Sequence, residues 1–398
     1  MRNFTFKGLF VTAVFMLLGC LTIQAADDYL ITKQITIKLE EAGTLPNKIA
    51  SSEMYKITNL KITGEINGTD WKMIREMAGS NYKGEPTEGK LSVLDLSEAR
   101  IVNGGGEYYY YGYNYNCYTS NDVIGEYAFK GCSGLTSLNL PAGITSIGSR
   151  AFYGCSGLTS LNLPADITYI GLYAFYGCSG LTSLTIPTGV SIINEYAFYD
   201  CSSLTRLDLP SSIREIYHSA FMNCRNLTSL TIPSNVTYIS SRAFSGCSSL
   251  KNITLPTRIF GIGDNAFYGC SNLNSLTLSY ELREINEYAF CDCNGLTSIY
   301  VYADKVPKMC EDVFKGCDAK KCTIYVPKGT YGDYRSSDFG YFENIVEFDA
   351  TGIDKTTTSI DVEEVSRYSV NGQRLVGPTK GLNIVKYSDG SVKKVAVE

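Results

Sequence analysis

Histidine is almost absent from this chain, which holds one, His218, among 398 residues. A catalytic triad and a histidine zinc site each need an imidazole placed beside further matched side chains. This chain repeats, and the positions equivalent to His218 vary, so His218 is expected at a variable, exposed site. Those positions carry Ser149, Leu172, Glu195, Ser241, Asp264 and Glu287. We therefore expect neither a triad nor a histidine metal site.

Residues for other chemistry are scarce as well. Glycoside hydrolysis needs two acids facing each other across a cleft, but Glu126 and Glu287 fall on expected turns, and Asp208 is nearly alone on the expected strand face. The glycines at 104–106 lack the lysine and the strand-to-helix context of a phosphate loop. Close Cys-x-x-Cys pairs, which zinc favours, are missing. The sequence predicts no enzyme, no metal and no cofactor.

Positive charge is also in short supply, with 35 lysines and arginines against 40 aspartates and glutamates, a net charge of −5. Phosphate backbones are bound by basic stripes, and none is present, so nucleic acid is not an expected partner. Beyond the N-terminal segment, no run reaches the roughly 18 apolar residues that a membrane-spanning helix needs.

The N-terminal segment, residues 1–25, is predicted to be a signal peptide. It has Arg2 and Lys7, an apolar run over residues 9–18, and small residues at Ala25 and Ala26 for cleavage. The protein is therefore expected to be secreted or displayed on the outer cell surface. As an alternative, Leu17-Leu18-Gly19-Cys20 resembles a lipoprotein cleavage box, which would leave a lipid anchor at Cys20 as the one contact with a membrane.

Cysteine, by contrast, recurs at a fixed interval of 23 residues, with one final interval of 24. The members of this column are Cys132, Cys155, Cys178, Cys201, Cys224, Cys247, Cys270, Cys293 and Cys317. Each unit reads like "CSGLTSLNLPAGITSIGSRAFYG", residues 132–154. Self-similarity at such a period is typical of a repeat protein.

Each unit predicts one coil. Leu135, Leu138 and Leu140 form a Leu-x-x-Leu-x-Leu strand, and most copies end at a proline that stops the strand. A second apolar pair and an Ala-Phe pair follow. One coil cannot enclose a core, but stacked coils bury these columns against one another, about 4.8 Å apart.

The repeated unit resembles the Treponema-type leucine-rich repeat of BspA-like bacterial surface proteins. The resemblance covers roughly residues 29–349, because Ile57-x-x-Leu60 and Leu91-x-x-Leu94 begin partial units upstream. It implies a right-handed leucine-rich repeat solenoid, rich in β-strand with short turns and helices. We expect an N-terminal cap with irregular repeats at 26–131, including a short helix at 70–79, and regular repeats with a C-terminal cap at 132–349.

The last fifty residues differ from the repeats. A polar linker is predicted at 350–361, followed at 362–398 by a small β-hairpin module with turns at Asn371-Gly372 and Asp389-Gly390. This tail is similar to the C-terminal sorting modules of Bacteroidetes proteins that use type IX secretion, which implies surface display or release.

The cysteine column is predicted to be reduced and buried. Adjacent coils bring the α-carbons close enough for disulfides, but parallel side-chain directions hold the sulfurs in a ladder, where cysteine serves as a small buried hydrophobe. Cys291, Cys310 and Cys322 lie outside the column, so they are free to pair near the C-terminal end.

Tyrosine provides the candidate binding residues. An insertion of about twenty irregular residues, 104–122, divides one coil, and insertions in solenoids often carry binding function. The alternatives are a loop folded down to shield the N-terminal coils and simple low-complexity sequence. Two stripes of tyrosine also flank the Ala-Phe pairs, and these side chains either cover the phenylalanine core or contact a ligand. The candidates are Tyr108, Tyr109, Tyr110, Tyr111, Tyr113, Tyr115, Tyr118, Tyr153, Tyr173, Tyr176, Tyr196 and Tyr199.

The resemblance implies an adhesion or interaction protein that binds host or microbial proteins. A glycan-binding module that assists polysaccharide capture is the alternative. The tyrosines fit both ligands, so the sequence leaves the choice open.

Overall fold

The structure is a computed structural model that describes residues 29–112 and 115–350, together with four strands nearer the C-terminus. Contacts divide the chain into two compact units, Met1–Phe348 and Asp349–Glu398, which are described separately. The expected signal peptide, Cys20 and nearly all of the expected linker lie outside the described residues.

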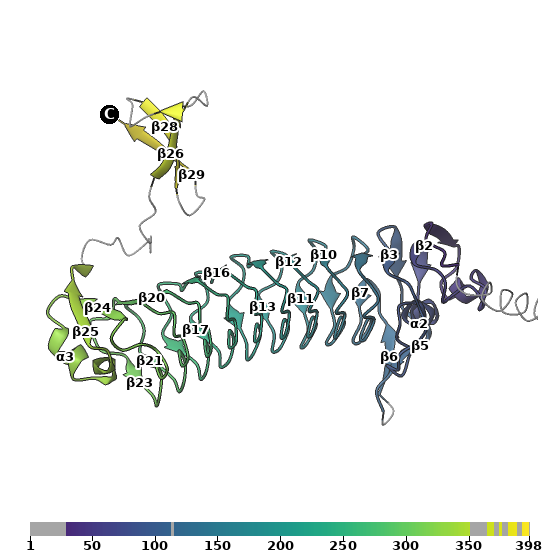
Figure 1. The fold of residues 1–398 in the computed structure, drawn as a ribbon. Coiled ribbons are helices and arrows are strands. Elements are labelled where there is room, and N and C mark those ends of the chain that lie inside the picture. Colours follow the sequence, from purple (N-terminus) through teal and green to yellow (C-terminus); the bar gives the residue numbers. More distant parts are fainter. Residues whose placement is uncertain are drawn as a thin grey trace, which may run out of the picture. The chain divides into compact units, whose positions relative to one another are not determined.

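The first unit is a stack of coils with a short strand on each of two sides (Figure 1). The first row of strands comprises β3 (Val93–Asp95), β8 (Ser137–Asn139), β10 (Ser160–Asn162), β12 (Ser183–Thr185), β14 (Arg206–Asp208), β16 (Ser229–Thr231), β18 (Asn252–Thr254), β20 (Ser275–Leu278), β22 (Ser298–Val301), β24 (Thr323–Pro327) and β25 (Asn344–Phe348). The second row comprises β7 (Val123–Ile124), β9 (Ser146–Ile147), β11 (Tyr169–Ile170), β13 (Ile192–Ile193), β15 (Glu215–Ile216), β17 (Tyr238–Ile239), β19 (Gly261–Ile262), β21 (Glu284–Ile285) and β23 (Lys308–Met309).

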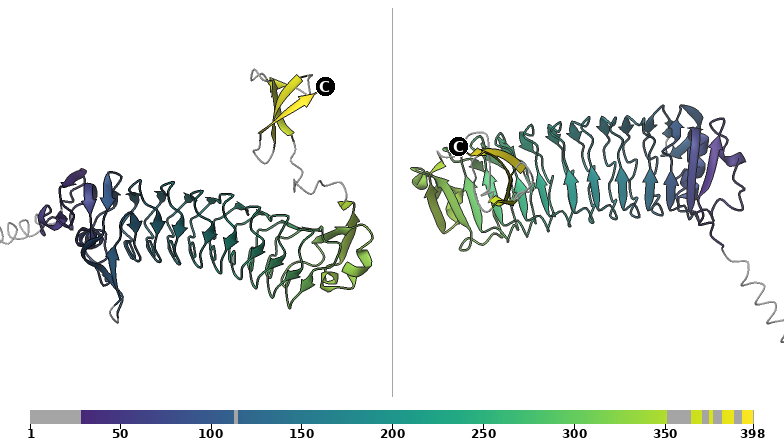
Figure 2. Two further views of the ribbon diagram at one scale, coloured as in Figure 1. Left: turned by 180° about the vertical axis from the view of Figure 1, so that it is seen from behind. Right: turned by 90° about the horizontal axis from the view of Figure 1, so that it is seen from above.

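Pairing within each row is parallel, and the register advances by one repeat per coil. Leu138 of β8 lies opposite Leu161 of β10, and Ile147 of β9 lies opposite Ile170 of β11. The views in Figure 2 follow both rows along the stack. The predicted leucine-rich repeat solenoid with 23-residue coils is confirmed.

Burial follows the expected columns. In β10 the central Leu161 is buried, whereas Ser160 and Asn162 are exposed. The phenylalanines of the Ala-Phe pairs form a continuous column through the core, with neighbouring ring centres from Phe129 to Phe314 separated by 5.1 to 5.6 Å. Because each ring stacks on the rings before and after it, the apolar core runs the length of the stack.

Each coil turns its corners at two left-handed backbone positions. One precedes Ala-Phe and the other precedes the cysteine, as at Tyr196 (φ 55°) and Asp200 (φ 55°). Glycine, asparagine and aspartate tolerate this region best, which explains Gly154 and Gly177 before the cysteines. A bulky residue there costs about 1 to 2 kcal/mol, so repeated tyrosine at the first corner indicates compensating contacts.

The N-terminal cap adds β1 (Ile35–Leu39), the short 3-10 helix η1 (Leu45–Asn47), β2 (Asn59–Ile66), α2 (Gly68–Met77) and β4 (Ala99–Ile101). β1, β2 and β3 continue the first row in parallel, and β4 pairs with β2. The predicted helix begins two residues earlier than expected, because Asn67 and Asp70 form a capping box.

Helix α2 also closes the open end of the regular coils. In the stack, amides of one coil donate to carbonyls of the next, as Phe152 N does to Ala174 O at 2.8 Å. The first such coil has no regular coil before it, so side chains supply the donors. These bonds are Tyr108 Oη to Glu126 O (2.8 Å), Trp71 Nε1 to Ala128 O (3.0 Å), Arg75 Nη1 to Tyr127 O (2.7 Å) and Arg75 Nη2 to Lys130 O (3.1 Å).

The tyrosine-rich insertion is not an irregular loop. It forms an antiparallel hairpin of β5 (Gly104–Tyr110) and β6 (Asn116–Thr119), which extends beside α2 and away from the stack (Figures 1 and 2). The sequence-based expectation failed because hairpin pairing and the burial of two rings against the cap outweigh the glycine-rich composition of residues 104–106.

The C-terminal end of the first unit is covered by β25, α3 (Tyr331–Arg335) and the 3-10 helix η2 (Asp338–Tyr341). The hydroxyl of buried Tyr334 donates to Ala303 O at 2.6 Å, and the ring of Phe342 meets that of Phe314 edge-on. Cys291, Cys310 and Cys322 are all free, so the alternative of pairing among them is not realised.

The second unit contains a four-stranded antiparallel sheet. Its strands are β26 (Glu364–Ser369), β27 (Arg374–Leu375), β28 (Gly381–Tyr387) and β29 (Val392–Val397), in the order β27-β26-β28-β29. β26 pairs with β27, and β28 with β29, as the two predicted hairpins require. The predicted turn residues Asn371-Gly372 and Asp389-Gly390 lie outside the described residues.

Candidate functional site

The five repeat tyrosines singled out in the sequence form two stacks on one flank of the solenoid. In one, Tyr153, Tyr176 and Tyr199 come from successive coils, with ring centres 4.6 Å apart and ring planes within 1° of parallel. In the other, Tyr173 and Tyr196 stack at 4.6 Å. All five are half-buried. The coil-to-coil rise thus places equivalent rings at stacking distance, which compensates the strained corner backbone.

Arg150 continues the second stack where a tyrosine is missing. It occupies the same corner position as Tyr173, and its guanidinium lies 4.5 Å from the ring centre of Tyr173 and 5.6 Å from that of Tyr127. Its Nη1 also donates to Tyr127 Oη at 3.3 Å. A planar guanidinium over an aromatic face is a favourable cation–π contact, so the stack is unbroken from Tyr127 to Tyr196.

Tyr127 joins this flank to the hairpin. The rings of Tyr109 and Tyr111 both stack on it, with centres at 4.7 and 5.4 Å. Lys130 lies among these rings, with its Nζ 5.2 Å from the centre of Tyr127, and donates to Tyr109 Oη at 2.9 Å. The buried rings of Tyr109 and Tyr127 therefore join the insertion to the repeat stripes. We call the whole set the aromatic flank. Its accessible members are Tyr111, Lys130, Arg150, Tyr153, Tyr173, Tyr176, Tyr196 and Tyr199, and its buried members are Tyr109 and Tyr127.

The hairpin tyrosines divide into buried and exposed sets. Tyr108 and Tyr109 are 1% and 2% exposed, so the expectation that they contact a ligand is wrong: Tyr108 caps the first regular coil, and Tyr109 lies over the guanidinium of Arg75. The exposed set is Tyr110 (39%), Tyr111 (56%), Tyr115 (53%) and Tyr118 (53%). Tyr113 lies outside the described residues.

Burial and hydrogen bonding raise the pKa of three tyrosine hydroxyls at or beside this surface. Partial burial, with neighbouring Tyr153 and Tyr199, raises the pKa of Tyr176 to about 12. Burial likewise raises the pKa of Tyr173, against the opposing charge of Arg150. The pKa of Tyr115 is raised because its hydroxyl donates to the Glu126 carboxylate at 2.9 Å. These hydroxyls are therefore neutral hydrogen-bond donors at ordinary pH.

The single histidine of the chain lies beside the aromatic flank. His218, expected to be exposed, is half-buried, and its ring meets that of Tyr196 edge-on at 5.3 Å, so it extends the flank. Across residues 29–112 and 115–350, no group of three His, Cys, Asp or Glu side chains is placed to hold a metal ion. No helix in the described part of the chain is long and apolar enough to cross a membrane.

A second candidate surface lies on the first row of strands. Arg206 of β14 pairs with Asp208 through two contacts, Nε to Oδ1 at 3.2 Å and Nη2 to Oδ2 at 3.1 Å. Beside this pair is a shallow cavity of about 430 Å³ that is otherwise lined largely by hydroxyl, amide and leucine side chains, among them Ser229 and Asn252. Because Arg206 and Asp208 pair with each other, the groups left for a ligand in this cavity are mainly neutral hydroxyls and amides.

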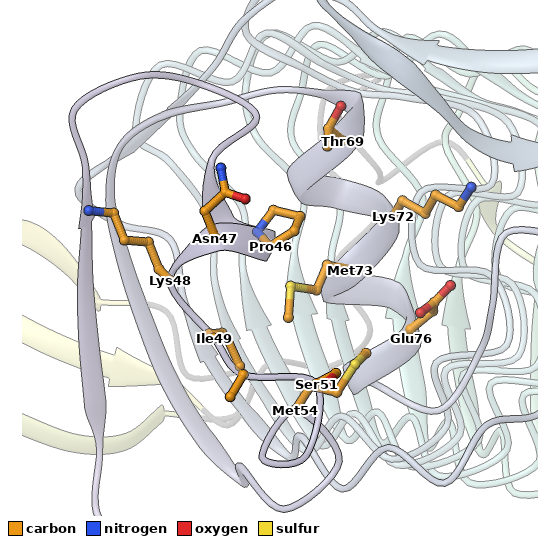
Figure 3. Close-up of a pocket in the computed structure, with 11 residues that line it drawn as sticks. Pro46, Asn47, Lys48, Ile49, Ser51, Met54, Thr69, Lys72, Met73 and Glu76 are labelled. Atoms are coloured by element: carbon orange, nitrogen blue, oxygen red, sulfur yellow. The ribbon is translucent and has the colours of Figure 1, made fainter.

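A third candidate is a cavity of about 690 Å³ in the N-terminal cap, between the loop around η1 and helix α2 (Figure 3). The Asp70 carboxylate ties this loop to the helix by accepting from Gly43 N at 2.6 Å and Leu45 N at 2.9 Å. Met54 and Met73 point into the space between them (Figure 3). No sequence pattern indicates this cavity, because the residues that line it, within 46–54 and 69–76, come together only when the loop around η1 packs against α2.

Two residues of the aromatic flank, Lys130 and Arg150, were missed as site residues, whereas Tyr127 belongs to the tyrosine stripe that the sequence predicts. A signal was available, because Arg150 and Lys130 occupy the two repeat columns that carry tyrosine in the following coils. Reading each column for residues that substitute for tyrosine would have found both.

Together these features define a leucine-rich repeat protein that presents a lateral aromatic surface. The chain belongs to the family described as BspA type leucine rich repeat region, whose sequence profile matches six copies over residues 113–228 and 214–334. The predicted resemblance of the repeats is thereby confirmed. No curated protein matches the chain.

Solved structures with similar repeats include three bacterial proteins. A leucine rich cell surface protein from Faecalibacterium prausnitzii is 24% identical over 57% of this chain and 76% of its own, with a TM-score of 0.31. The T. pallidum leucine rich repeat protein is 26% identical over 50% and 74%, with a TM-score of 0.32. A leucine-rich repeat protein from Bacteroides ovatus is 20% identical over 79% and 92%, with a TM-score of 0.30. Because these TM-scores are low, the family assignment rests on the repeat profile.

Proposed function

We propose that this chain is an exported, non-enzymatic interaction protein whose aromatic flank binds a protein ligand on a host or microbial surface. The observation that carries the proposal is the continuity of the flank, in which rings from four successive coils and from the hairpin form one series of contacts, with Arg150 joining Tyr127 to Tyr173. Adhesion through this surface is the function it supports best.

Stacking of the rings lowers the entropic cost of binding to the flank. A binding surface made of mobile side chains loses rotamer freedom when the ligand arrives, at a cost of about 0.5 to 1.5 kcal/mol per side chain. In the flank, Tyr176 is already held between two rings at 4.6 Å. Tyrosine also supplies a large contact area with only two side-chain torsions, as in antibody paratopes. The flank is thus preorganised for binding.

A glycan-binding module that assists polysaccharide capture is the second candidate. The observation in its favour is the hairpin, whose Tyr110, Tyr115 and Tyr118 are exposed and leave ring surface available to sugars. This alternative predicts binding through the hairpin and little effect of changes in the repeat stacks.

Surface location is part of the proposal. The predicted signal peptide would export the chain, and either a lipidated Cys20 or a C-terminal sorting module at 362–398 would retain it at the surface. Mass spectrometry of the mature protein from its native membrane and culture fractions tests these routes, because a lipidated Cys20 and a cleaved C-terminal module each change the intact mass.

Binding is tested by incubating the full chain with arrays of extracellular-matrix proteins, microbial surface proteins and glycans. We expect protein hits that a double Tyr176→Ser and Tyr199→Ser variant loses. Tyr268→Ser is the matched control, since Tyr268 occupies the same repeat position, is exposed, and has Ser245 and Cys291 in place of ring neighbours. Glycan hits that survive the double variant would favour the second candidate, and equal loss with the control variant would contradict the proposed surface.

A further inference from the structure

Two cations of the aromatic flank have no carboxylate partner. Lys130 and Arg150 form no ion pair with any residue in 29–112 and 115–350. Both are half-buried, and they lie 5.2 and 5.6 Å from the ring centre of Tyr127, on which they converge. In a chain of net charge −5, two converging cations without counter-ions are an unexpected feature. The rings hold them in place without neutralising them.

Stacking decides which part of each tyrosine meets a ligand. In the repeat stacks both faces of Tyr176 are covered by Tyr153 and Tyr199. The surface that remains consists of ring edges and phenolic hydroxyls. The aromatic quadrupole makes ring edges positive and ring faces negative, and a phenolic hydroxyl can donate a hydrogen bond. The edges, hydroxyls and two cations therefore all favour an anion.

Nearby carboxylates limit the extent of this site. The Glu126 carboxylate is held by the Tyr115 hydroxyl at 2.9 Å. Asp200 adjoins the far end of the other stack, where its charge contributes to the raised pKa of Tyr176. Glu126 and Glu195 also contribute to the raised pKa of Tyr127 and Tyr173, respectively, so carboxylates border the segment around Lys130 and Arg150. Within that segment, Lys130 and Arg150 are the two cations available to a ligand.

We propose that this segment binds carboxylate side chains of an acidic, Asp- and Glu-rich stretch of a protein partner. The inference rests on the proposed function and specifies its ligand chemistry. A peptide is favoured over an acidic polysaccharide because sugars are recognised largely by stacking on open aromatic faces, and the inner rings of both stacks have none. Charge complementarity with two held cations provides the specificity.

The probe is a fluorescent twelve-residue peptide rich in glutamate, with a second peptide in which glutamine replaces every glutamate. Anisotropy with the full chain should show at least tenfold tighter binding of the glutamate peptide at low salt, and the difference should shrink as sodium chloride rises. Equal binding of the two peptides would overturn the inference.

Substitutions of the two cations test where on the flank the peptide binds. Arg150→Gln and Lys130→Gln should each weaken binding of the glutamate peptide about fivefold, while Arg150→Lys should retain more than half of the affinity. The matched controls are Arg242→Gln and Lys315→Gln. Arg242 occupies the same corner position as Arg150 with Ser219 and Asn265 beside it in the column, and Lys315, equivalent to Lys130, is paired with Asp312. Equal loss in the control variants would contradict the assignment.

The outcomes separate this inference from the proposed function. If Arg150→Gln leaves binding to the arrays unchanged, the acidic-ligand inference is wrong, whereas the proposed interaction role is unaffected. Absence of both array hits and peptide binding would remove both. A polyuronate oligosaccharide, tested alongside, overturns the choice of peptide if it binds more tightly and loses affinity in the same two variants.

Discussion

The thiol of Cys201 donates a hydrogen bond of 3.2 Å to the carbonyl oxygen of Phe175 in the preceding coil. The same bond recurs along the column, from Cys155 to Phe129 at 3.1 Å through Cys293 to Phe267 at 3.2 Å. Valine at this corner would lack the donor, and serine would bring a more polar group into the core. Cysteine is small, weakly polar and a donor, which suits the site. The 23-residue cysteine period thus reflects packing and a repeated S–H···O contact.

The buried thiols predict a loss of stability in alkali. Burial, with the neighbouring thiols, raises the pKa of Cys155, Cys178 and Cys201 well above the usual range. In the unfolded chain these thiols ionise near pH 8.5. Stability is therefore full below that pH and falls above it, by about 1.4 kcal/mol per pH unit for each thiol until the folded pKa is reached. Urea unfolding between pH 7 and 10 measures this slope.

Cys201→Ala is the control for the alkaline effect. It removes one titrating thiol, so its free energy of unfolding should fall less steeply with pH than that of the parent, although it is lower at pH 7. An unchanged slope would show that other groups, such as tyrosines, govern the alkaline transition.

Alkylation should distinguish folded from unfolded thiols. In the native protein at pH 8, iodoacetamide should leave Cys155 to Cys270 unmodified, because they are fully buried and protonated. After denaturation without a reductant, all six should react. Mass spectrometry counts the adducts. Disulfide-linked peptides among these six cysteines would mean that oxidation accounts for the ladder.

Phe198→Ala should destabilise the protein by about 3 to 5 kcal/mol. Phe198 is fully buried in the middle of the phenylalanine column, 5.3 Å from the ring of Phe175 and 5.4 Å from that of Phe221. Its loss leaves a cavity that the neighbouring coils cannot close without breaking register. Chemical denaturation measures the change, and Tyr268→Ala, on the surface, should cost less than about 1 kcal/mol.

Arg75→Met should cost at least about 3 kcal/mol, since buried carbonyls left unpaired cost about 1 to 3 kcal/mol each. The variant keeps an apolar stem but removes the donors to Tyr127 O and Lys130 O. Hydrogen exchange should show the first regular coil opening before the rest. Arg100→Met, which breaks only exposed ion pairs, is the matched control and should stay within about 1 kcal/mol. Equal losses would argue against a capping role.

Tyr108→Phe tests the hairpin as part of the cap. It removes the hydroxyl that donates to Glu126 O at 2.8 Å and should lower stability by about 1 to 2 kcal/mol. Tyr118→Phe, on the same hairpin but exposed, should change stability by less than about 0.5 kcal/mol. A thermal melt of each variant separates the two. Indistinguishable melting temperatures would argue against a capping role for Tyr108.

Repetition made much of the fold predictable from one sequence. Nine copies of the cysteine position align the chain with itself, so that the period alone assigns Leu138, Ile147 and Phe152 each to a buried column. The hairpin could not be predicted in this way, since it occurs once and its strand pairing depends on contacts with α2. The same holds for the cap cavity between Met54 and Met73.

The candidate site was likewise predictable only in its repeated part. The tyrosine stripes were visible in the sequence, because each ring recurs at a fixed place in the 23-residue period. The rise of the coils accounts for the 4.6 Å spacing between stacked rings. The contact between Tyr109 and Tyr127, by contrast, depends on how the hairpin packs against the cap. Local sequence does not predict contacts between an insertion that occurs once and a surface built from repeats.

Sequence alone determined the period, the buried columns and the family, because every coil meets the same neighbours and periodic burial leaves a periodic pattern. Tertiary structure decided the function of the residues outside that pattern. It buried Tyr108 and Tyr109, set Lys130 and Arg150 among the rings, and left Tyr111 exposed. Which tyrosines reach solvent depends on long-range packing, and no spacing along the chain encodes it.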